Sequence, residues 1–469
     1  MADLNKEFDV AIIGSGPGGY WAAVRAGEYG LSTVVIEKDE KVGGTCLLVG
    51  CIPTKALLHN ADVMDIMRNA KELGVDLGSF ALNWAQVQAR KDKIVAKHSK
   101  GIEFLFRKNK VETVRGTASW AGPGKLDVAL AGGGKQQIKA KHIILATGSS
   151  ARTLPGLPAD DRVLTNVEIL KMDKVPAKLI VVGAGAVGCE FASIFRRFGS
   201  DVTIVEMLPR IVALEDEEVS KELEKAFKKQ KINIHTGAKV EKIEKTAQGV
   251  KVTVTTADGK SQALEADKVL IAVGRKPVTE GMNLEKTRIQ FDRGFIKVDP
   301  FMRTGEPGVY AIGDIVAGTQ QLAHVASAEG LVAVAHIAGK PVTPVDYGKI
   351  PNATYTEPSV ASVGLTEAAA KAKGLKVKVG KFPFLGNSKA TILGSHEGFI
   401  KMIADEKDGT VLGVHMIGPS VTELIGEAVL AMQLGASADE IMETVHAHPT
   451  LYEAMLDAAN SVYGLTINM

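Results

Sequence analysis

An apolar run that ends in a glycine-rich turn occurs twice along this chain. In residues 8–37, the run Val10–Ile13 leads into the turn, and a helical pattern and a second apolar run follow. Residues 177–206 repeat this order of strand, turn, helix and strand. Short apolar runs beside glycine are typical of buried strands in a parallel sheet. The pattern therefore predicts two βαβ units of similar build.

Each βαβ unit is followed by a β-rich region and a further apolar strand that ends in glycine. The first region contains the turn AGGGK and leads to HIILATGS at 142–149, and the second contains ADGK and leads to KVLIAVGR at 268–275. A short third strand, in GVYAIGDIVAG at 308–318, ends in Gly313-Asp314. An aspartate after a strand is by itself often only a helix cap, so Asp314 is a weak signal at this point.

The pattern changes after residue 350. The stretch GFIKMIADEKDGTVLGVHMIGP is typical of a hairpin whose turn contains Asp408-Gly409, and VTELIGEAVLAMQLGA has a helical period. We therefore expect residues 351–469 to form a separate α+β domain without a nucleotide signature. The predicted fold class is α/β, with two Rossmann-like dinucleotide-binding domains followed by this C-terminal domain.

Length and composition narrow the functional classes. The chain has 469 residues, enough for roughly three domains, and 45% of them are hydrophobic. The 56 basic and 54 acidic residues give a net charge of +2, which predicts neither nucleic acid nor a membrane surface as a partner. No targeting segment or membrane-spanning run stands out, so we expect a cytoplasmic protein, although a transit peptide removed earlier would leave no trace.

The two glycine turns have the same spacing. Each reads G-x-G-x-x-G, and an acidic residue follows 23 positions after the first glycine. The first glycine permits a tight turn, the second lets the backbone approach a pyrophosphate, and the third lets the helix pack on the strand. The residues concerned are Gly14, Gly16, Gly19 and Glu37 in the first unit, and Gly183, Gly185, Gly188 and Glu206 in the second.

Two dinucleotide sites in one chain indicate that electrons pass between two redox cofactors. A single glycine motif is weak evidence, but here each copy has its strand, helix and distal acid. Glu206 favours NAD over NADP, because a carboxylate repels a 2′-phosphate. Arg210 lies near enough in the sequence to leave NADP open as the alternative.

Two of the three cysteines, Cys46 and Cys51, lie in the stretch GGTCLLVGCIPTKALL. In a reducing compartment a close pair is more often catalytic or metal-binding than structural, and no further Cys or His stands nearby at zinc spacing. We expect Cys51 at the amino end of a helix that opens around Pro53. The helix dipole alone lowers a thiol pKa by less than about one unit, so a persistent thiolate needs a flavin or a cation such as Lys55. The third cysteine, Cys189, is expected only to pack.

A base for thiol chemistry is available near the carboxyl end, in VHAHPTLYEAM. His446 and His448 precede Pro449, and a helix starting there would carry Glu453. The carboxylate of Glu453 could then reach back and orient the imidazole of His448. The alternative is that both histidines are ordinary surface or interface residues.

Together these motifs resemble the flavin-dependent pyridine nucleotide-disulfide oxidoreductase family over essentially the whole chain. Within that family the sequence is most similar to the dihydrolipoyl dehydrogenase branch. The motifs are GSGPGG (14–19), GGTCLLVGCIPTKALL (43–58), ATGS (146–149), GAGAVGCEF (183–191), AIGD (311–314) and HAHPTLYEA (446–454).

The resemblance implies an order of domains and a pair of cofactors. Residues 1–150 would bind FAD, residues 151–281 would bind NAD, residues 282–350 would complete the FAD domain, and residues 351–469 would form the dimerisation domain. No metal is implied. The implied cofactor-binding residues are Gly14, Gly16, Gly19, Glu37, Thr45, Lys55, Gly148, Gly183, Gly185, Gly188, Glu190, Glu206, Gly274 and Asp314.

The resemblance also implies roles for the reacting groups. Cys46 would exchange with substrate, Cys51 would face the flavin, and His448, oriented by Glu453, would be the acid–base for the cysteines of the other subunit of a homodimer. Lys55 would lie near the flavin and pair with Glu190, and Asp314 would bind the ribityl chain.

The implied reaction is oxidation of dihydrolipoamide, carried by an acyltransferase or carrier protein of a 2-oxo acid dehydrogenase or glycine-cleavage system, with reduction of NAD⁺. The alternatives are another NAD(P)H-dependent disulfide or small-oxidant reductase of this fold, and a non-catalytic flavoprotein. The sequence departs from common versions of the family at four positions, namely Leu48, Thr54, Val278 and Tyr452.

Overall fold

The computed structural model describes residues 6–468 and forms two compact units. Each unit contains one of the two predicted glycine turns. Unit 1 comprises Met1–Ala56, Ala85–Arg152 and Arg275–Val345, and unit 2 comprises Leu57–Trp84, Thr153–Gly274 and Asp346–Met469.

Unit 1 is built on a mostly parallel sheet. Its elements are β1 (Glu7–Ile13), α1 (Pro17–Glu28), β2 (Thr33–Glu37), α2 (Gly44–Val49), the start of α3 (Cys51–Arg68), most of α4 (Trp84–Lys108), β3 (Glu112–Gly122), β4 (Lys125–Leu130), β5 (Lys135–Leu145), β6 (Ser149–Ala151), β15 (Arg275–Pro277), β16 (Phe291–Asp292), β17 (Phe295–Ile296), β18 (Val309–Ala311) and α8 (Ala323–Ile337).

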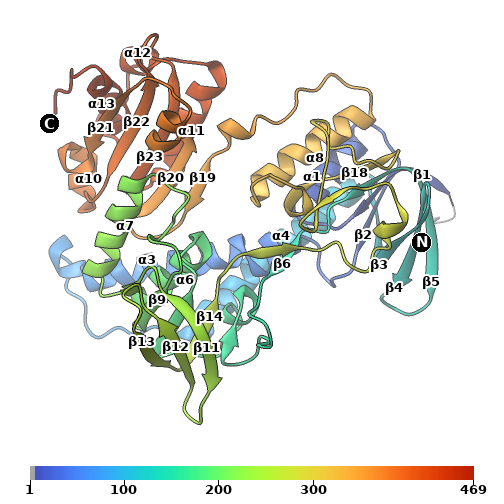
Figure 1. The fold of residues 1–469 in the computed structure, drawn as a ribbon, viewed down its shortest axis with the longest axis horizontal. Helices are drawn as coiled ribbons and strands as arrows, with labels where there is room; N and C mark the ends of the chain where they lie inside the picture. The colour runs from blue at the N-terminus through green and yellow to red at the C-terminus, as the bar shows by residue number, and fades with distance from the viewer. Residues whose placement is uncertain (1–5, 469) are drawn as a thin grey trace. The chain divides into compact units, whose positions relative to one another are not determined.

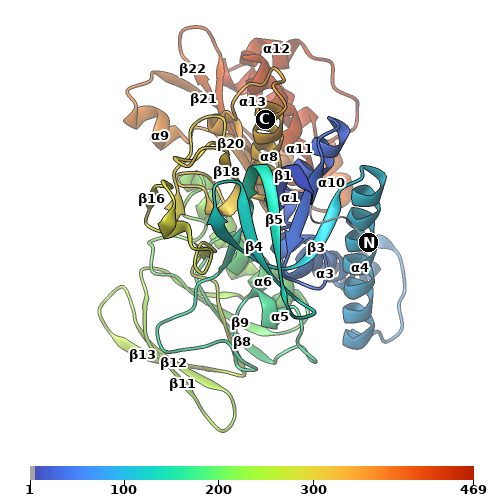
Figure 2. The same cartoon turned by 90° about the vertical axis from the view of Figure 1, so that its right-hand side faces the viewer.

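The central strand of this sheet is β1, which pairs in parallel with β2 and β5. β3 and β18 extend the parallel order on the two sides, and β4 pairs antiparallel with β3 and β5. Side chains alternate along a strand, so Val10 and Ile12 face the opposite way from Ala11 and Ile13. Val10 and Ile12 pack with α1 and α8, which lie side by side (Figures 1 and 2), whereas Ala11 and Ile13 pack with β3, β4 and β5.

Unit 2 contains the second βαβ unit and the C-terminal region. Its elements are the rest of α3, β7 (Val163–Leu164), α5 (Asn166–Ile169), β8 (Lys178–Val182), α6 (Ala186–Arg197), β9 (Asp201–Val205), α7 (Glu217–Lys229), β10 (Asn233–His235), β11 (Lys239–Lys245), β12 (Val250–Thr255), β13 (Ser261–Ala266), β14 (Lys268–Ile271), β19 (Asn352–Thr354), β20 (Ser359–Gly364), α9 (Glu367–Ala372), β21 (Val377–Pro383), α10 (Ser388–Leu393), β22 (Phe399–Asp405), β23 (Val411–Gly418), α11 (Val421–Leu434), α12 (Ala438–Glu443) and α13 (Glu453–Val462).

Three sheets organise unit 2. The parallel sheet has the order β10–β9–β8–β14–β7, and β11, β12 and β13 form a separate antiparallel sheet, as the β-rich pattern after the second glycine turn predicts. The C-terminal sheet has the antiparallel order β19–β20–β23–β22–β21. Its β22–β23 hairpin turns at Gly409, where φ is +73°, which confirms the predicted turn. The predicted α/β class with a C-terminal α+β region is therefore confirmed.

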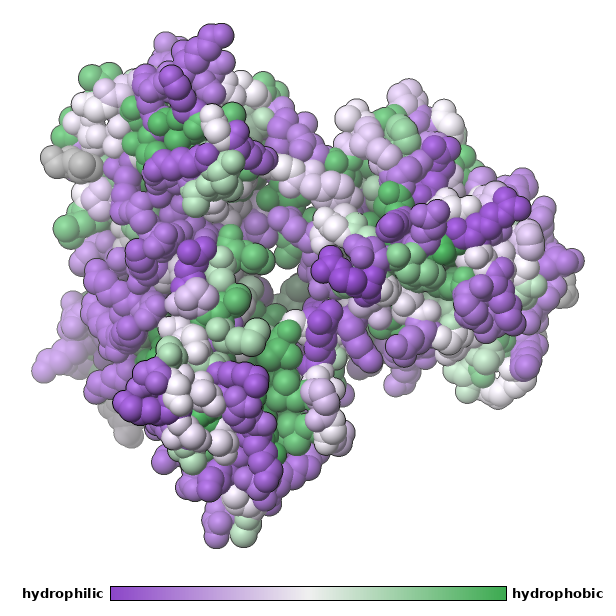
Figure 3. Space-filling view, viewed as in Figure 1, coloured by the Kyte–Doolittle hydropathy of each residue, from purple (hydrophilic) through white to green (hydrophobic). Residues whose placement is uncertain are grey.

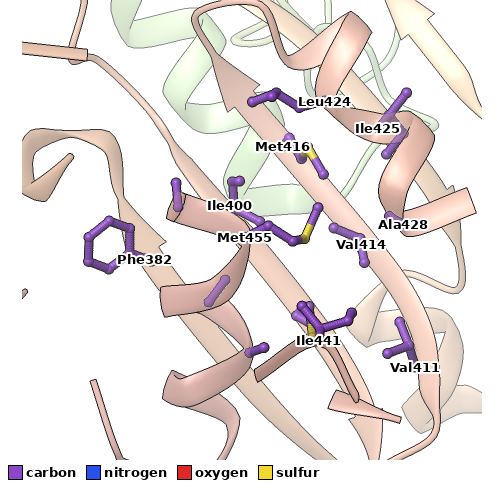
Figure 4. Close-up of a cluster of buried hydrophobic side chains, with 14 of the residues drawn as sticks. Phe382, Ile400, Val411, Val414, Met416, Leu424, Ile425, Ala428, Ile441 and Met455 are labelled. Atoms are coloured by element: carbon purple, nitrogen blue, oxygen red, sulfur yellow. The ribbon is translucent and has the colours of Figure 1, made fainter. Parts of the chain in front are cut away.

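The C-terminal sheet is stabilised by an apolar core on which three helices pack. Met416 and Val414 of β23 face Ile425 of α11, Ile441 of α12 and Met455 of α13 (Figure 4). Such buried side chains each stabilise the folded state by about 1.5–3 kcal/mol. On the molecular face drawn in Figure 3, apolar side chains are interspersed among hydrophilic ones. Within residues 6–468, none of the helices combines the length and apolar character needed to cross a membrane.

A buried ion cluster joins α7 to the C-terminal sheet. Lys401 of β22 is 2% exposed, and its Nζ lies 3.1 Å from Asp216 Oδ1 at the N-cap of α7. It also lies 2.7 Å from carboxylate oxygens of Glu218 and Glu367. Although burial raises the pKa of Glu218, hydrogen bonds from Lys381 and Lys401 lower it to about 2. Asp216 is 3% exposed and depends on Lys401 for charge compensation.

Replacement of Lys401 by Met is therefore expected to destabilise unit 2. It leaves the buried carboxylate of Asp216 without its cation, a loss that costs about 3–5 kcal/mol in comparable pairs. The measurement is the midpoint of urea unfolding. Lys407→Met, in the exposed turn between β22 and β23, is the control and is expected to change stability by less than about 0.5 kcal/mol. Equal midpoints for the two variants would contradict a stabilising role of the cluster.

Candidate active site

The first glycine turn connects β1 to α1 and needs glycine at two of its three motif positions. Gly14 has φ +106°, and a Cβ placed there would lie 2.3 Å from the carbonyl oxygen of Ala146. A Cβ on Gly19 would lie 2.0 Å from the Gly14 oxygen, so α1 approaches the strand end only because that atom is missing. A Cβ on Gly16 would meet only the Gly44 Cα, at 3.9 Å. Gly16 caps α1, so its open side leaves the helix N-terminus accessible to a phosphate group.

The second glycine turn repeats this geometry between β8 and α6. Gly183 has φ +100°, and a Cβ on Gly188 would lie 1.9 Å from the Gly183 oxygen. A Cβ on Gly185, the N-cap of α6, would meet nothing within 4 Å. In both turns the first glycine has a positive φ, the second has open space beside it and the third packs closely, as in a dinucleotide site.

The two distal acids make the same contact with their turns. Glu37 Oε2 accepts a hydrogen bond from Ser15 N at 2.9 Å, and Glu206 Oε2 accepts one from Ala184 N at 2.6 Å. Glu206 Oε1 also accepts from Leu208 N at 2.7 Å. A carboxylate has about four acceptor positions, so Glu206 keeps free positions for a ribose diol. This arrangement fits NAD.

The cysteine pair lies on two successive helices of unit 1. Cys46 is half-buried in the short helix α2, and Cys51 is exposed as the first residue of α3. The helix therefore begins two residues before Pro53, and Cys46 lies on a helical turn of its own instead of a plain glycine turn. Neither side chain is part of a disulfide.

The two thiols are in different electrostatic environments. The hydrogen bond with Cys51 and burial raise the pKa of the Cys46 thiol, while the charge of Lys55 acts to lower it. Ionisation of the Cys46 thiol is therefore disfavoured by its surroundings. Cys189 is fully buried in α6, and burial raises the pKa of its thiol, which agrees with a packing role.

The predicted partners Lys55 and Glu190 lie in different units. Lys55 is half-buried on α3, one helical turn beyond Cys51. Glu190 is 5% exposed on α6, and its Oε1 accepts a hydrogen bond from Tyr355 N at 3.1 Å. Their mutual pairing stays a prediction.

A polar group that the sequence reasoning missed surrounds Asp314. Ser149 Oγ donates to Asp314 Oδ2. Arg275 Nε donates to Ser149 Oγ at 2.6 Å and lies 3.7 Å from Asp314 Oδ2. Burial lowers the pKa of Arg275, whereas the charges of Asp314 and Cys51 raise it. Gly313 N donates to Glu329, a fully buried carboxylate of α8, at 2.6 Å.

A sequence signal existed for part of this group. Ser149 and Arg275 each directly follow a predicted strand-end glycine, Gly148 and Gly274, and polar residues at strand ends are typical of ligand sites in α/β folds. Both glycines have positive φ, +69° and +107°, and a Cβ on either would meet nothing within 4 Å. Thr45, the remaining predicted cofactor residue, directs its hydroxyl to Ser149 O at 3.5 Å.

The two C-terminal histidines differ sharply in exposure. The His448 side chain is 71% exposed, and its Nδ1 lies 2.8 Å from Glu453 Oε1, so the predicted hydrogen bond is present. Glu453 is the first residue of α13, which begins four residues after Pro449. Although burial raises the pKa of Glu453, hydrogen bonds from Thr450 N and His448 lower it below the usual range. His446 is 6% exposed and paired with Glu427 at 2.8 Å.

The structure accounts for three of the four departures from the family pattern. Thr54 Oγ1 donates to Gly50 O at 2.7 Å, a bond that serine also makes. The backbone nitrogen of Val278 donates to Gly148 O at 2.9 Å, and this bond does not depend on which side chain the residue carries. Leu48 packs against the apolar core of unit 1. Nothing in the structure explains Tyr452. Among residues 6–468, no three His, Cys, Asp or Glu side chains gather as metal ligands would.

Comparison with known proteins assigns the family. Residues 8–330 match the pyridine nucleotide-disulphide oxidoreductase family, and residues 350–459 match its dimerisation domain, which indicates a homodimer. The chain is 44% identical to the dihydrolipoyl dehydrogenase of Rhizobium etli, covering 99% of this chain and 100% of that protein. The dihydrolipoyl dehydrogenase of Bacillus subtilis gives the same three values.

The fold agrees with this assignment. The crystal structure of LpdA from Mycobacterium tuberculosis superposes with a TM-score of 0.89 at 29% identity, covering 96% of this chain and 98% of that one. Members of the family use FAD and a pyridine nucleotide, and both glycine turns have the open second position that such cofactors require. The chain therefore belongs to the pyridine nucleotide-disulphide oxidoreductase family, with FAD- and NAD-binding domains and a C-terminal dimerisation domain.

Proposed function

We propose that this protein acts as a dihydrolipoyl dehydrogenase, oxidising protein-bound dihydrolipoamide to lipoamide and reducing NAD⁺ to NADH. The observation that carries the proposal is the thiol pair, in which a half-buried Cys46 is hydrogen-bonded to an exposed Cys51 beside the first glycine turn. The names of the relatives from Rhizobium etli and Bacillus subtilis support the same substrate.

The first step is a proton transfer at His448. Its Nδ1 is hydrogen-bonded to Glu453, which stays ionised because its pKa is lowered, so Nε2 is the nitrogen that accepts a proton. One thiol of dihydrolipoamide gives its proton to Nε2 and becomes a thiolate. The exposed position of His448 suits a base that serves a site on a partner subunit.

The second step is thiol–disulfide exchange at the oxidised pair. The substrate thiolate attacks Cys46 Sγ, the Cys46–Cys51 bond breaks, and Cys51 leaves as a thiolate. The second substrate sulfur then attacks the mixed disulfide and its proton passes to Cys46, which leaves as a thiol, so lipoamide leaves as a disulfide and the pair is left as a Cys46 thiol and a Cys51 thiolate. A bound FAD would supply two-electron transfer from this reduced pair to NAD⁺.

The residues around the thiols have supporting roles in this proposal. Lys55 would lie near a bound flavin and pair with Glu190, and Asp314 would hold the ribityl chain together with Ser149 and Arg275. The first glycine turn with Glu37, Thr45 and Gly148 binds FAD. The second glycine turn with Glu206 and Gly274 binds NAD.

The proposal extends to domains, partners and location. Residues 1–150 and 282–350 form the FAD domain, residues 151–281 the NAD domain and residues 351–469 the dimerisation domain. The substrate is carried by an acyltransferase or carrier protein of a 2-oxo acid dehydrogenase or glycine-cleavage system. The homodimer acts in the cytoplasm, and the His448–Glu453 pair of one subunit serves the cysteines of the other.

The deciding assay follows NADH absorbance after purified protein is mixed with NADH and lipoamide. We expect NADH to be consumed only when lipoamide is present. Consumption with small oxidants but not with lipoamide would identify another reductase of the same fold. FAD that is bound but never reduced by NADH would identify a non-catalytic flavoprotein.

The two cysteines are expected to differ when replaced singly. Cys46→Ser leaves a Cys51 thiolate beside oxidised flavin and is expected to give long-wavelength absorbance, whereas Cys51→Ser is expected to give none. The measurement is the visible spectrum of each purified variant at neutral pH. Identical spectra would refute the assignment of roles.

Replacement of His448 by Gln is expected to lower lipoamide turnover by about 10²–10⁴-fold, the usual contribution of general acid–base catalysis. His446→Gln is the matched control, because this neighbouring histidine also pairs with a glutamate but is buried. We expect His446→Gln to keep turnover close to that of the unsubstituted protein. A small effect of His448→Gln in steady-state assays would place the base elsewhere.

A further inference from the structure

We propose that Ser15 is a positioning residue that ties the first glycine turn to the cysteine segment, residues 42–51, and so sets where Cys46 and Cys51 lie beside the cofactor site. This inference rests on the proposed redox role of the two cysteines. It concerns a residue that neither binds substrate nor reacts.

A continuous chain of hydrogen bonds makes the connection. Gly43 N donates to Ser15 Oγ at 3.0 Å, and Ser15 Oγ donates to Glu37 Oε2 at 2.5 Å. Ser15 N donates to the same carboxylate oxygen at 2.9 Å. Ser15 is fully buried and Glu37 is 5% exposed, so water has little access to replace these bonds.

The direction of the hydroxyl group follows from its chemistry. A serine hydroxyl has one proton and can donate only one hydrogen bond. The Glu37 carboxylate accepts this hydrogen bond, and a lone pair of Ser15 Oγ is then available to accept one from the Gly43 N–H. Alanine in place of Ser15 would leave the buried Gly43 N–H without its acceptor.

The same place is where the two backbones come closest. A Cβ on Gly44 would lie 2.5 Å from the Gly16 Cα, so the cysteine segment lies directly against the glycine turn. Gly43 and Gly44 have φ values of +126° and +62°, which bend the chain into α2. Cys46 is the third residue of α2, so a displacement of Gly43 is passed to its thiol.

Other hydrogen bonds also anchor the cysteine segment. Ser99 Oγ donates to Val42 O at 2.9 Å, and Thr54 Oγ1 donates to Gly50 O at 2.7 Å. Ser99 and Ser15 thus bind the C=O and the N–H of the same peptide group, directly before α2, and the Ser15 hydroxyl is the partner on the N–H side. Its loss therefore affects the stretch that carries Cys46.

The second glycine turn provides an internal comparison. Ala184 occupies the position equivalent to Ser15, and its backbone N–H still donates to Glu206 at 2.6 Å. The contact between turn and acid therefore needs no hydroxyl group. In the first βαβ unit, the Ser15 hydroxyl group makes the added connection to Gly43. The second βαβ unit is followed by no cysteine segment that would need such a connection.

The test uses the full-length FAD-loaded protein with Ser15→Ala and, as the matched control, Ser119→Ala, which removes the same hydroxyl group from an exposed bond to Asp127 O at 3.4 Å in β3. One equivalent of dihydrolipoamide is added, and the long-wavelength absorbance of the reduced enzyme is recorded. Loss of one buried hydrogen bond shifts a conformational equilibrium by about 5–30-fold, so we expect Ser15→Ala to lose at least about half of this absorbance. Turnover with dihydrolipoamide should fall with it, while the KM for NAD⁺ stays unchanged. Ser119→Ala should match the unsubstituted protein.

A second measurement covers a Ser15→Ala variant that binds FAD poorly. Hydrogen exchange of the FAD-free protein is followed in peptides covering residues 42–51, and we expect faster exchange in Ser15→Ala than in Ser119→Ala. Unchanged absorbance in the loaded variant, or unchanged exchange in the FAD-free one, would overturn the proposal. Absence of long-wavelength absorbance from the unsubstituted protein would instead refute the redox role of the cysteines, and the exchange measurement would still test Ser15.

Discussion

The backbone contact between the first glycine turn and the cysteine segment is the constraint on which the proposed site depends. Gly44 reaches Gly16 only because it has no side chain, since a Cβ there would lie 2.5 Å from the Gly16 Cα. A phosphate-binding turn and a reactive sulfur pair are thereby held next to each other by main-chain atoms, whose positions vary less than those of long side chains. A cofactor that the glycine turn holds is therefore also positioned for the cysteine pair.

The two thiols also differ in the electrostatic environment that surrounds them. Burial and the hydrogen bond to Cys51 keep Cys46 protonated, and the positive charge of Lys55 opposes them only in part. The charge of Cys51 also acts to raise the pKa of Arg275, which bonds with Ser149 and lies near Asp314. Two chemically identical side chains thus lie in different environments, as the proposed division of their roles requires.

The sequence predicted the elements that repeat a pattern and missed contacts between elements. Both glycine turns, their acids and the C-terminal hairpin follow from local spacing and backbone conformation, which short windows encode. Arg275 bonds with Ser149 across 126 positions, and nothing in either local stretch specifies that partner. Glu329 gave a weaker signal as one carboxylate in an apolar helix, and its acceptor role became visible only with the position of Gly313. The helix α2, which carries Cys46, was not predicted, because its six residues are too few to show a period.

The contrast between the two C-terminal histidines bears on why the reaction needs two subunits. His446 and His448 each pair with a glutamate at 2.8 Å, yet only His448 is exposed, at 71% against 6%. A solvated imidazole is an inefficient base for a substrate thiol, because nothing holds the thiol within reach of its nitrogen. It becomes an effective one when a second surface covers it, excludes water and brings the disulfide within reach. An oriented but uncovered histidine on a dimerisation domain is thus what the proposed site, completed by assembly, requires.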